Sequence, residues 1–180
     1  MIGQFKFSGF LLLGVLLATG AAADDLKTCI YESGDVALEA CNRAINSGRY
    51  SGVDLSNAYM NRGAEWLKKG NYDRAIADST TTIKLFPKAT IAYENRGLAW
   101  KIKGDFKKAL ADYSAAIRND PENPGPYIKR ASLREEQGDR AGAIADLRRA
   151  LATKPDKSKF VNVERFYGQA REALERLSKP

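Results

Sequence analysis

A pattern that recurs every 34 residues constrains this chain more than any other feature of its sequence. At least six positions keep their residue through three consecutive copies in the middle of the chain. These positions are Tyr59, Tyr93 and Tyr127; Arg62, Arg96 and Arg130; Gly70, Gly104 and Gly138; Ala75, Ala109 and Ala143; Asp78, Asp112 and Asp146; and Pro87, Pro121 and Pro155. A period of this length is typical of small units that cannot bury their apolar face alone and must stack on one another.

Each copy has the residue pattern of a helix, a tight turn and a second helix that a proline ends. A glycine followed by Asn or Asp, as in Gly70-Asn71 and Gly104-Asp105, ends one helix and provides the capping side chain of the next. The second segment carries apolar residues at helical spacing, and a proline closes the copy. The sequence therefore predicts an all-α chain of antiparallel helix pairs.

The pattern resembles the tetratricopeptide repeat family, whose signature places aromatic, small and proline residues at fixed offsets. The central copy carries this signature as Tyr93, Gly97, Trp100, Ala109, Tyr113, Ala116 and Pro121. The neighbouring copies depart from it at Ser79, Thr82 and Arg134. The resemblance implies a right-handed superhelix (a solenoid), with tetratricopeptide repeats at residues 56–89, 90–123 and 124–157.

The two cysteines of the chain follow the same 34-residue step. Cys29 and Cys41 stand where the next copy has Gly63 and Ala75, small residues at a point where the two helices of a pair are expected to approach closely. We therefore expect a degenerate first repeat at residues 24–53, closed by a structural disulfide. Two unrelated buried thiols are an alternative. A redox-active pair is less favoured, because such pairs usually have C-x-x-C spacing.

The composition excludes most enzymatic chemistry. The chain has no histidine and only two cysteines, which removes the commonest general base, the usual nucleophile systems and a structural zinc site. We therefore expect a protein that is not an enzyme and needs neither a cofactor nor a metal. An enzymatic role would require a catalytic partner on another chain.

The first 23 residues have the pattern of a signal peptide. A positive start with Lys6 precedes the apolar run Phe10–Leu17, and three alanines offer a cleavage site before Asp24. A membrane anchor is the alternative, but the apolar stretch is shorter than the roughly 20 residues that a spanning helix needs. The sequence predicts an exported chain, which we assign to the bacterial periplasm, without a transmembrane span after cleavage.

The C-terminal end differs from the repeats in pattern and in charge. Residues 158–180 carry apolar side chains at helical spacing, so we expect one helix that caps the last repeat. From Arg148 to Pro180 there are 9 Lys+Arg and 4 Asp+Glu. This charge is either a solvated face or a contact of residues 148–180 with an anionic surface or an acidic protein. Nucleic acid is not expected, because the basic residues do not alternate with exposed aromatic ones.

Without catalytic residues, function is expected on the concave face that the first helices of the repeats would line. In tetratricopeptide proteins, fixed positions of each repeat face this groove. The positions that the resemblance assigns to binding a peptide or protein partner are Asn57, Met60, Asn61, Leu67, Ile91, Glu94, Asn95, Leu98, Ile128 and Lys129.

Two asparagines stand out among these residues. Asn61 and Asn95 occupy the same position one repeat apart, and an amide can bond both the N–H and the C=O of an extended peptide. In some family members a ladder of asparagines holds a peptide in this way; alternatively, these residues are only the stock sequence of such repeats. The family's clamp for a C-terminal carboxylate is not expected, because only two of its five places match. Those places hold Met60, Ala64, Asn95, Gly125 and Lys129.

The repeated Arg and Asp residues have a simpler interpretation. Arg62, Arg96 and Arg130 are expected to lie opposite the three repeated aspartates on the second helices. Such pairs are worth roughly 0–1 kcal/mol each when exposed. The leading functional hypothesis is therefore a non-catalytic scaffold of the cell envelope that binds a partner segment in its concave groove. The alternative is an envelope adaptor that docks through its basic C-terminal helix.

Overall fold

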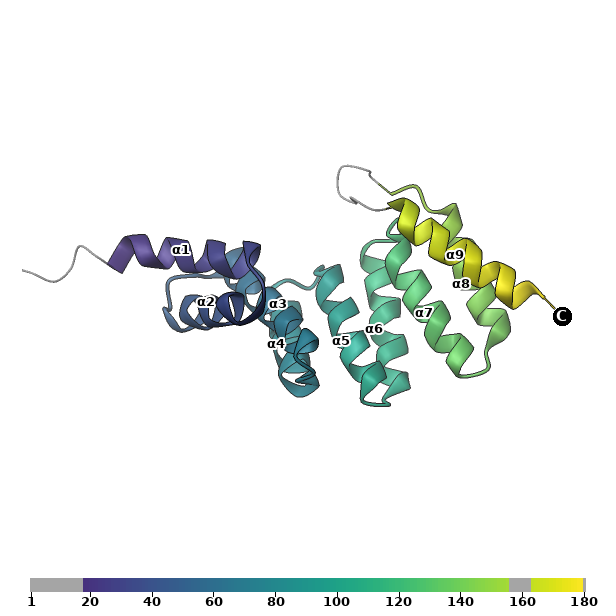
Figure 1. The fold of residues 1–180 in the computed structure, drawn as a ribbon, viewed down its shortest axis with the longest axis horizontal. Helices are drawn as coiled ribbons and strands as arrows, with labels where there is room; N and C mark the ends of the chain where they lie inside the picture. Colours follow the sequence, from purple (N-terminus) through teal and green to yellow (C-terminus); the bar gives the residue numbers. More distant parts are fainter. Residues whose placement is uncertain (1–17, 156–162, 180) are drawn as a thin grey trace, which may run out of the picture.

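The computed structural model describes residues 18–155 and 163–179, and within these ranges it contains nine α-helices and no strand. The helices follow one another along an elongated array, from α1 at one end to α8 and α9 at the other (Figure 1). Their bounds are α1 Ala18–Tyr31, α2 Gly34–Asn46, α3 Gly52–Lys68, α4 Tyr72–Leu85, α5 Thr90–Ile102, α6 Phe106–Asn119, α7 Pro124–Glu136, α8 Arg140–Ala152 and α9 Val163–Ser178. The prediction of an all-helical chain is confirmed.

The turn inside each pair forms as the sequence predicts. Gly70 has a φ of 73°, a left-handed conformation that glycine adopts without a steric penalty. The side chain of Asn71 then accepts a hydrogen bond of 3.2 Å from the backbone N–H of Arg74, which caps α4. Gly104-Asp105 and Gly138-Asp139 repeat this geometry before α6 and α8. Each turn therefore reverses the chain and starts the second helix in the same few residues.

Packing between pairs follows one scheme along the array. Each second helix contacts its own first helix and the first helix of the next pair, so that α2, α4, α6 and α8 also pack on α3, α5, α7 and α9. First helices contact one another as well, at α1–α3, α3–α5 and α7–α9. The first helices therefore line a common surface, and we call the part formed by α3, α5 and α7 the first-helix face.

Small side chains allow the helices of a pair to approach closely. Ala75 and Ala109 are completely buried. A Cβ atom placed on Gly63 would lie 3.2 Å from the Cβ of Asp78 on the facing helix. This close approach agrees with the expectation from the 34-residue register, in which these positions are always small.

The first pair, α1 and α2, is joined by the disulfide that the register predicts. Cys29 and Cys41 are bonded with an S–S distance of 2.08 Å and a Cα–Cα distance of 4.7 Å. Both residues are buried and pack with Ala40, Ala44 and Ala58 in one core cluster. The bridge thus lies inside the first pair and against α3, where it is closed off from solvent.

The two ends of the array can be compared with the signal peptide and the C-terminal helix that the sequence predicts. Helix α1 begins at Ala18, inside the segment predicted as a signal peptide, and residues 1–17 of that segment lie outside the described residues. At the other end, α9 packs on α8 and α7. Ala170 and Leu177 of α9 join the core cluster of the last pair, and Arg140 on α8 donates to the carbonyl oxygen of Leu177. No helix in the described ranges is long and apolar enough to cross a membrane.

Candidate functional site

A hollow opens on the first-helix face between α3 and α5. It has a volume of about 270 Å³ and is lined by Ser56, Asn57, Met60, Phe86, Lys88, Ala89, Thr90 and Ile91. Three of these residues, Asn57, Met60 and Ile91, were assigned to the groove from the sequence. We call this site the α3–α5 hollow.

Exposed apolar side chains make the α3–α5 hollow suited to binding. Ile91 is 55% exposed and Phe86 is 46% exposed, although both are large apolar residues that a folded chain usually buries. Phe86 lies in the connection between α4 and α5, where the other copies have Asp120 and Lys154. The sequence reasoning missed Phe86, and this break in the repeat pattern is the signal that would have found it.

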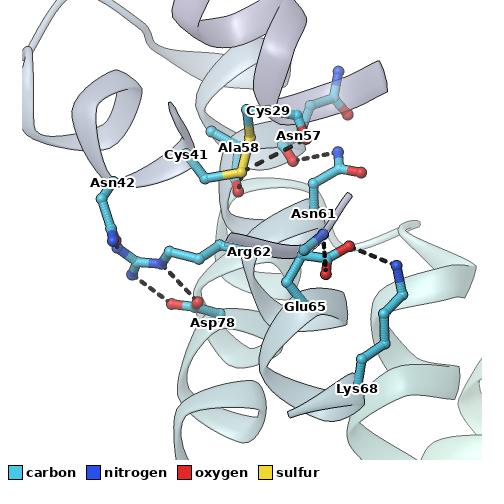
Figure 2. The surroundings of a disulfide bond; sticks show 11 residues. Cys29, Cys41, Asn42, Asn57, Ala58, Asn61, Arg62, Glu65, Lys68 and Asp78 are labelled. Atoms are coloured by element: carbon cyan, nitrogen blue, oxygen red, sulfur yellow. Dashed lines mark hydrogen bonds and ion pairs between the residues drawn. A yellow bond between two sulfur atoms is a disulfide. The ribbon is translucent and has the colours of Figure 1, made fainter. Parts of the chain in front are cut away.

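The two asparagines of the predicted ladder are not equivalent in the structure. The amide nitrogen of Asn61 donates a hydrogen bond of 2.9 Å to the carbonyl oxygen of Asn57, one turn earlier on α3 (Figure 2). Asn95 lies half-buried on α5, one turn beyond Ile91, and makes no side-chain hydrogen bond within the described residues. Because residues four apart share a helix face, Asn95 stands beside the α3–α5 hollow with its donor and acceptor both available.

The predicted charged residues of the groove bind each other. Lys129 on α7 forms an ion pair with Glu94 on α5, and Glu94 is only 8% exposed. Asn123 also donates to Glu94, at 3.5 Å. Lys101 on α5 pairs with Glu136 on α7, further along the same two helices. These two pairs connect α5 to α7, so the four charged groups that form them are already satisfied within the chain.

The remaining apolar groove residues are spread along the array. Leu67 on α3 and Leu98 on α5 are half-buried. Ile128 on α7 packs against the core cluster that includes Ala170 and Leu177 of α9. Ile128 therefore contributes to the contact between the last pair and α9, whereas Met60 and Ile91 remain around the α3–α5 hollow.

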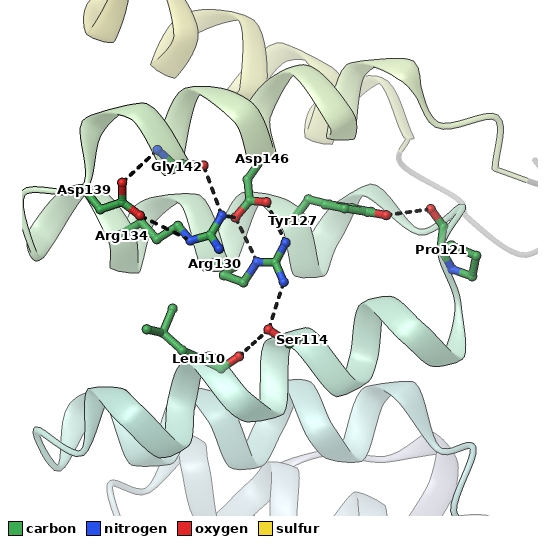
Figure 3. A network of polar contacts seen from close by, with 9 residues as sticks. All are labelled: Leu110, Ser114, Pro121, Tyr127, Arg130, Arg134, Asp139, Gly142 and Asp146. Carbon is green, nitrogen blue, oxygen red and sulfur yellow. Dashed lines mark hydrogen bonds and ion pairs between the residues drawn. The ribbon is translucent and has the colours of Figure 1, made fainter.

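The repeated Arg and Asp residues form a ladder of forked ion pairs. Arg130 donates from Nε and Nη2 to the two carboxylate oxygens of Asp146, at 2.9 and 2.7 Å, and from Nη1 to the hydroxyl of Ser114 on the preceding helix (Figure 3). Arg134 shares the same carboxylate at 2.8 Å. The hydrogen bond to Asp146 is the main cause that raises the pKa of Arg130. Each such arginine therefore links three helices.

These pairs are less exposed than the sequence reasoning assumed. The Arg96 and Asp112 side chains are 20% and 8% exposed, and the other two pairs are similar. A charged group left without its partner at such a site has a large desolvation cost. The value of 0–1 kcal/mol for exposed pairs therefore does not apply, and we correct it.

The basic C-terminal segment is partly neutralised by contacts within the chain. Arg176 pairs with Glu135, and Lys179 pairs with Glu175. Arg149 approaches Glu122 at 3.9 Å. The Arg176–Glu135 pair joins α9 to α7, the Lys179–Glu175 pair lies at the end of α9, and the Arg149–Glu122 contact joins α8 to the connection before α7. Across residues 18–155 and 163–179, no cluster of His, Cys, Asp or Glu side chains is arranged to hold a metal ion.

Comparison with known proteins agrees with the fold. Residues 65–124 match the family model described as tetratricopeptide repeat. The tetratricopeptide domain of Arabidopsis OM64 is 26% identical, with a TM-score of 0.60, and the alignment covers 71% of this chain and 98% of that domain. The TPR2B domain of yeast Sti1, in a complex with pHsp70, is 24% identical, with a TM-score of 0.54 and coverage of 66% and 97%. The first such domain of RPAP3, bound to the HSP90 peptide SRMEEVD, is 21% identical, with a TM-score of 0.60 and coverage of 73% and 96%.

No curated protein sequence matches the chain. The family match is confined to residues 65–124, and the chain shares the all-helical, tetratricopeptide-like fold of these structures.

Proposed function

We propose that this protein is a non-catalytic scaffold that holds an extended segment of a partner protein on its first-helix face. The observation that carries this proposal is the α3–α5 hollow with its exposed Ile91 and Phe86, since Asn95 follows Ile91 by one turn on the same helix face. An apolar hollow with a few polar groups at its edge is the usual composition of a binding site.

The α3–α5 hollow and Asn95 would bind different parts of the partner segment. An apolar side chain of the partner would fill the hollow against Met60, Phe86 and Ile91, where burying about 100 Å² of apolar surface contributes about 2.5 kcal/mol. The amide of Asn95 would bond the main chain of the same segment through its N–H and C=O groups. Asn61 would contribute less, because its donor is already bonded to its own helix.

The ligands of similar domains support this assignment but do not extend to its details. The Sti1 and RPAP3 domains are both in complexes, with pHsp70 and with an HSP90 peptide. This chain has Met60, Ala64 and Gly125 at three of the five places of the carboxylate clamp, and the Lys129 that does match is paired with Glu94. We therefore propose an internal or extended segment as the ligand, without a requirement for a free C-terminal carboxylate.

The place of action that we propose is the cell envelope, after export to the bacterial periplasm. Two features of the chain support it. The first residues have the charge and apolar pattern of a signal peptide. The chain also has a Cys29–Cys41 bridge, and structural disulfides persist mainly in oxidising compartments.

Peptides selected from a random display library against the full chain would test the proposed function. Binding of the selected peptides is then compared among the parent chain, Ile91→Asp, Asn95→Ala and the control Val36→Asp. Val36 is 59% exposed on α2, away from the hollow. We expect Asn95→Ala to weaken binding up to about tenfold, since one hydrogen bond is worth about 1 kcal/mol, and Ile91→Asp to weaken it more. Val36→Asp should bind as the parent does. Equal binding by all four chains would mean that the ligand uses another surface.

A further inference from the structure

A second hollow lies away from the first-helix face, at the junction of the first two pairs. It has a volume of about 330 Å³ and is lined by Asn42 of α2, Arg62 and Trp66 of α3, and Arg74, Ala77 and Asp78 of α4. We call it the α2–α4 hollow. Figure 2 shows the Arg62 guanidinium between the side chains of Asn42 and Asp78 at this junction.

The junction that contains this hollow differs from the two that follow it. Arg96 and Arg130 each reach a hydroxyl 16 residues earlier in the chain, on Thr80 and Ser114. Arg62 instead reaches Asn42, which is 20 residues earlier. A difference of four residues is about one helical turn, so Arg62 is bonded about one turn earlier on α2 than the later arginines are on α4 and α6.

In the α2–α4 hollow the charges of Arg62 and Asp78 cancel, and Arg74 adds one further positive charge. Arg62 donates to both oxygens of Asp78, at 2.8 and 2.7 Å, so these two charges neutralise each other. The guanidinium of Arg74 lies over the ring of Trp66, 4.5 Å from its centre. No carboxylate among the described residues forms an ion pair with Arg74. The α2–α4 hollow therefore carries one unbalanced positive charge.

The next repeat contains a natural control for this arrangement. Lys108 occupies the position of Arg74 and lies 4.2 Å from the centre of the Trp100 ring. Lys108 is paired with Asp105, the residue that caps α6, at 2.6 Å. The corresponding cap of α4 is Asn71, which has no charge. The cation over the tryptophan is thus neutralised in one repeat and left open in the other.

We propose that the α2–α4 hollow binds the carboxylate of an aspartate or glutamate side chain on a partner protein. Arg74 offers a planar fork of donors, the geometry that pairs best with a carboxylate. Among the residues that the structure describes, the side chain of Asn42 is bonded through its oxygen alone, to Arg62, so its amide nitrogen is available as a further donor. Trp66 and Ala77 provide apolar surface for the methylene groups of the incoming side chain.

Charge balance favours a carboxylate over a phosphate in this site. A carboxylate brings one negative charge and cancels the single excess positive charge. A phosphate carries about −1.5 to −2 near neutral pH and would place the additional negative charge close to the carboxylate of Asp78. This inference concerns a face separate from the α3–α5 hollow, so it stands or falls independently of the proposed function.

The experiment is a nuclear magnetic resonance titration of the full chain, observing the two indole N–H signals. The probe is glutamate blocked as its N-acetyl, N-methyl amide, and the neutral control is the same derivative of glutamine. We expect the glutamate probe to shift the Trp66 signal saturably and to leave the Trp100 signal in place. Arg74→Gln should weaken binding of the probe at least tenfold, whereas the matched variant Lys108→Gln should bind it as the parent does.

Several results would overturn the assignment. They are an equal response to the glutamine probe, an equal loss in the two variants, or no saturable shift at the solubility limit of the glutamate probe. Inorganic phosphate is titrated in the same way as a second probe. If phosphate binds more tightly than the glutamate probe and also requires Arg74, the site recognises phosphate and the carboxylate proposal is wrong.

Discussion

Removing one aspartate of the ladder tests how the repeats are held together. Asp112→Ala takes away both hydrogen bonds that Arg96 donates to the carboxylate, at 2.9 and 2.8 Å. Arg96, which is 20% exposed in the parent chain, then keeps its hydrogen bond to the hydroxyl of Thr80 and its place over the Tyr93 ring but has no carboxylate partner. The Cβ of residue 112, which lies close to Gly97, is retained in alanine. The change therefore isolates the loss of the charge pair from a change in packing.

The free energy of unfolding that Asp112→Ala should lose lies between two limits. Exposed ion pairs contribute about 0–1 kcal/mol, and removing one partner of a buried pair costs about 3–5 kcal/mol. Asp112 is 8% exposed, so we expect a loss near the lower end of the buried range, about 3 kcal/mol. With a urea m-value of about 2 kcal/mol/M, the unfolding midpoint should fall by about 1.5 M.

The assay is urea unfolding followed by circular dichroism, with Glu136→Ala as the matched control. Glu136 pairs with Lys101, but its side chain is 46% exposed, so its removal should cost less than about 1 kcal/mol. The double variant Arg96→Met/Asp112→Ala should recover much of the stability lost in Asp112→Ala, because no buried charge is left unpaired. If Asp112→Ala costs no more than Glu136→Ala, the ladder does not stabilise the array as argued.

Two further predictions concern the small residues and the disulfide. Gly97→Ala should lower the free energy of unfolding by about 2 kcal/mol through overpacking, because its Cβ would lie 2.8 Å from Cε1 of the buried Tyr113. In contrast, Gly168→Ala in α9, where a Cβ meets nothing within 4 Å, should gain up to about 1 kcal/mol; equal thermal midpoints for the two variants would contradict this. Replacing Cys29 and Cys41 together by alanine opens a bridge between residues 12 apart and should cost about 3 kcal/mol. Amide hydrogen exchange should then accelerate in α1 and α2 before α7 and α8, and uniform protection along the array would argue against a local role of the bridge.

Much of this fold follows from short-range patterns in the sequence. Gly70-Asn71 predicts the turn that the structure contains, because a glycine at positive φ and an adjacent cap act within a few residues. The 34-residue step carries the same information from copy to copy. It places Arg96 opposite Asp112, and it places Cys29 where a small residue faces position 41. These predictions hold because each depends on one helix pair, whose geometry repeats.

The details of the candidate sites depend on contacts that the repeat pattern does not specify. The sequence treats Asn61 and Asn95 as equivalent, but only Asn61 bonds its own helix. The Glu94–Lys129 ion pair joins residues 35 apart on different helices, so the 34-residue pattern alone does not reveal it. Phe86 enters the α3–α5 hollow from a connection that the repeat signature does not describe.

The sequence by itself determined that the chain forms helix pairs, where each pair turns and which residues link its two helices. It did so because helix propensity, capping and proline act within a few residues. A sequence pattern that recurs every 34 residues therefore gives a structure that recurs with it. Only the tertiary structure decided which polar groups are already bonded and which remain open to a partner. The hydrogen bond of Arg62 to Asn42 and the unpaired charge of Arg74 both occur where the first two pairs meet. At such a junction, partners from several helices are within reach of one side chain.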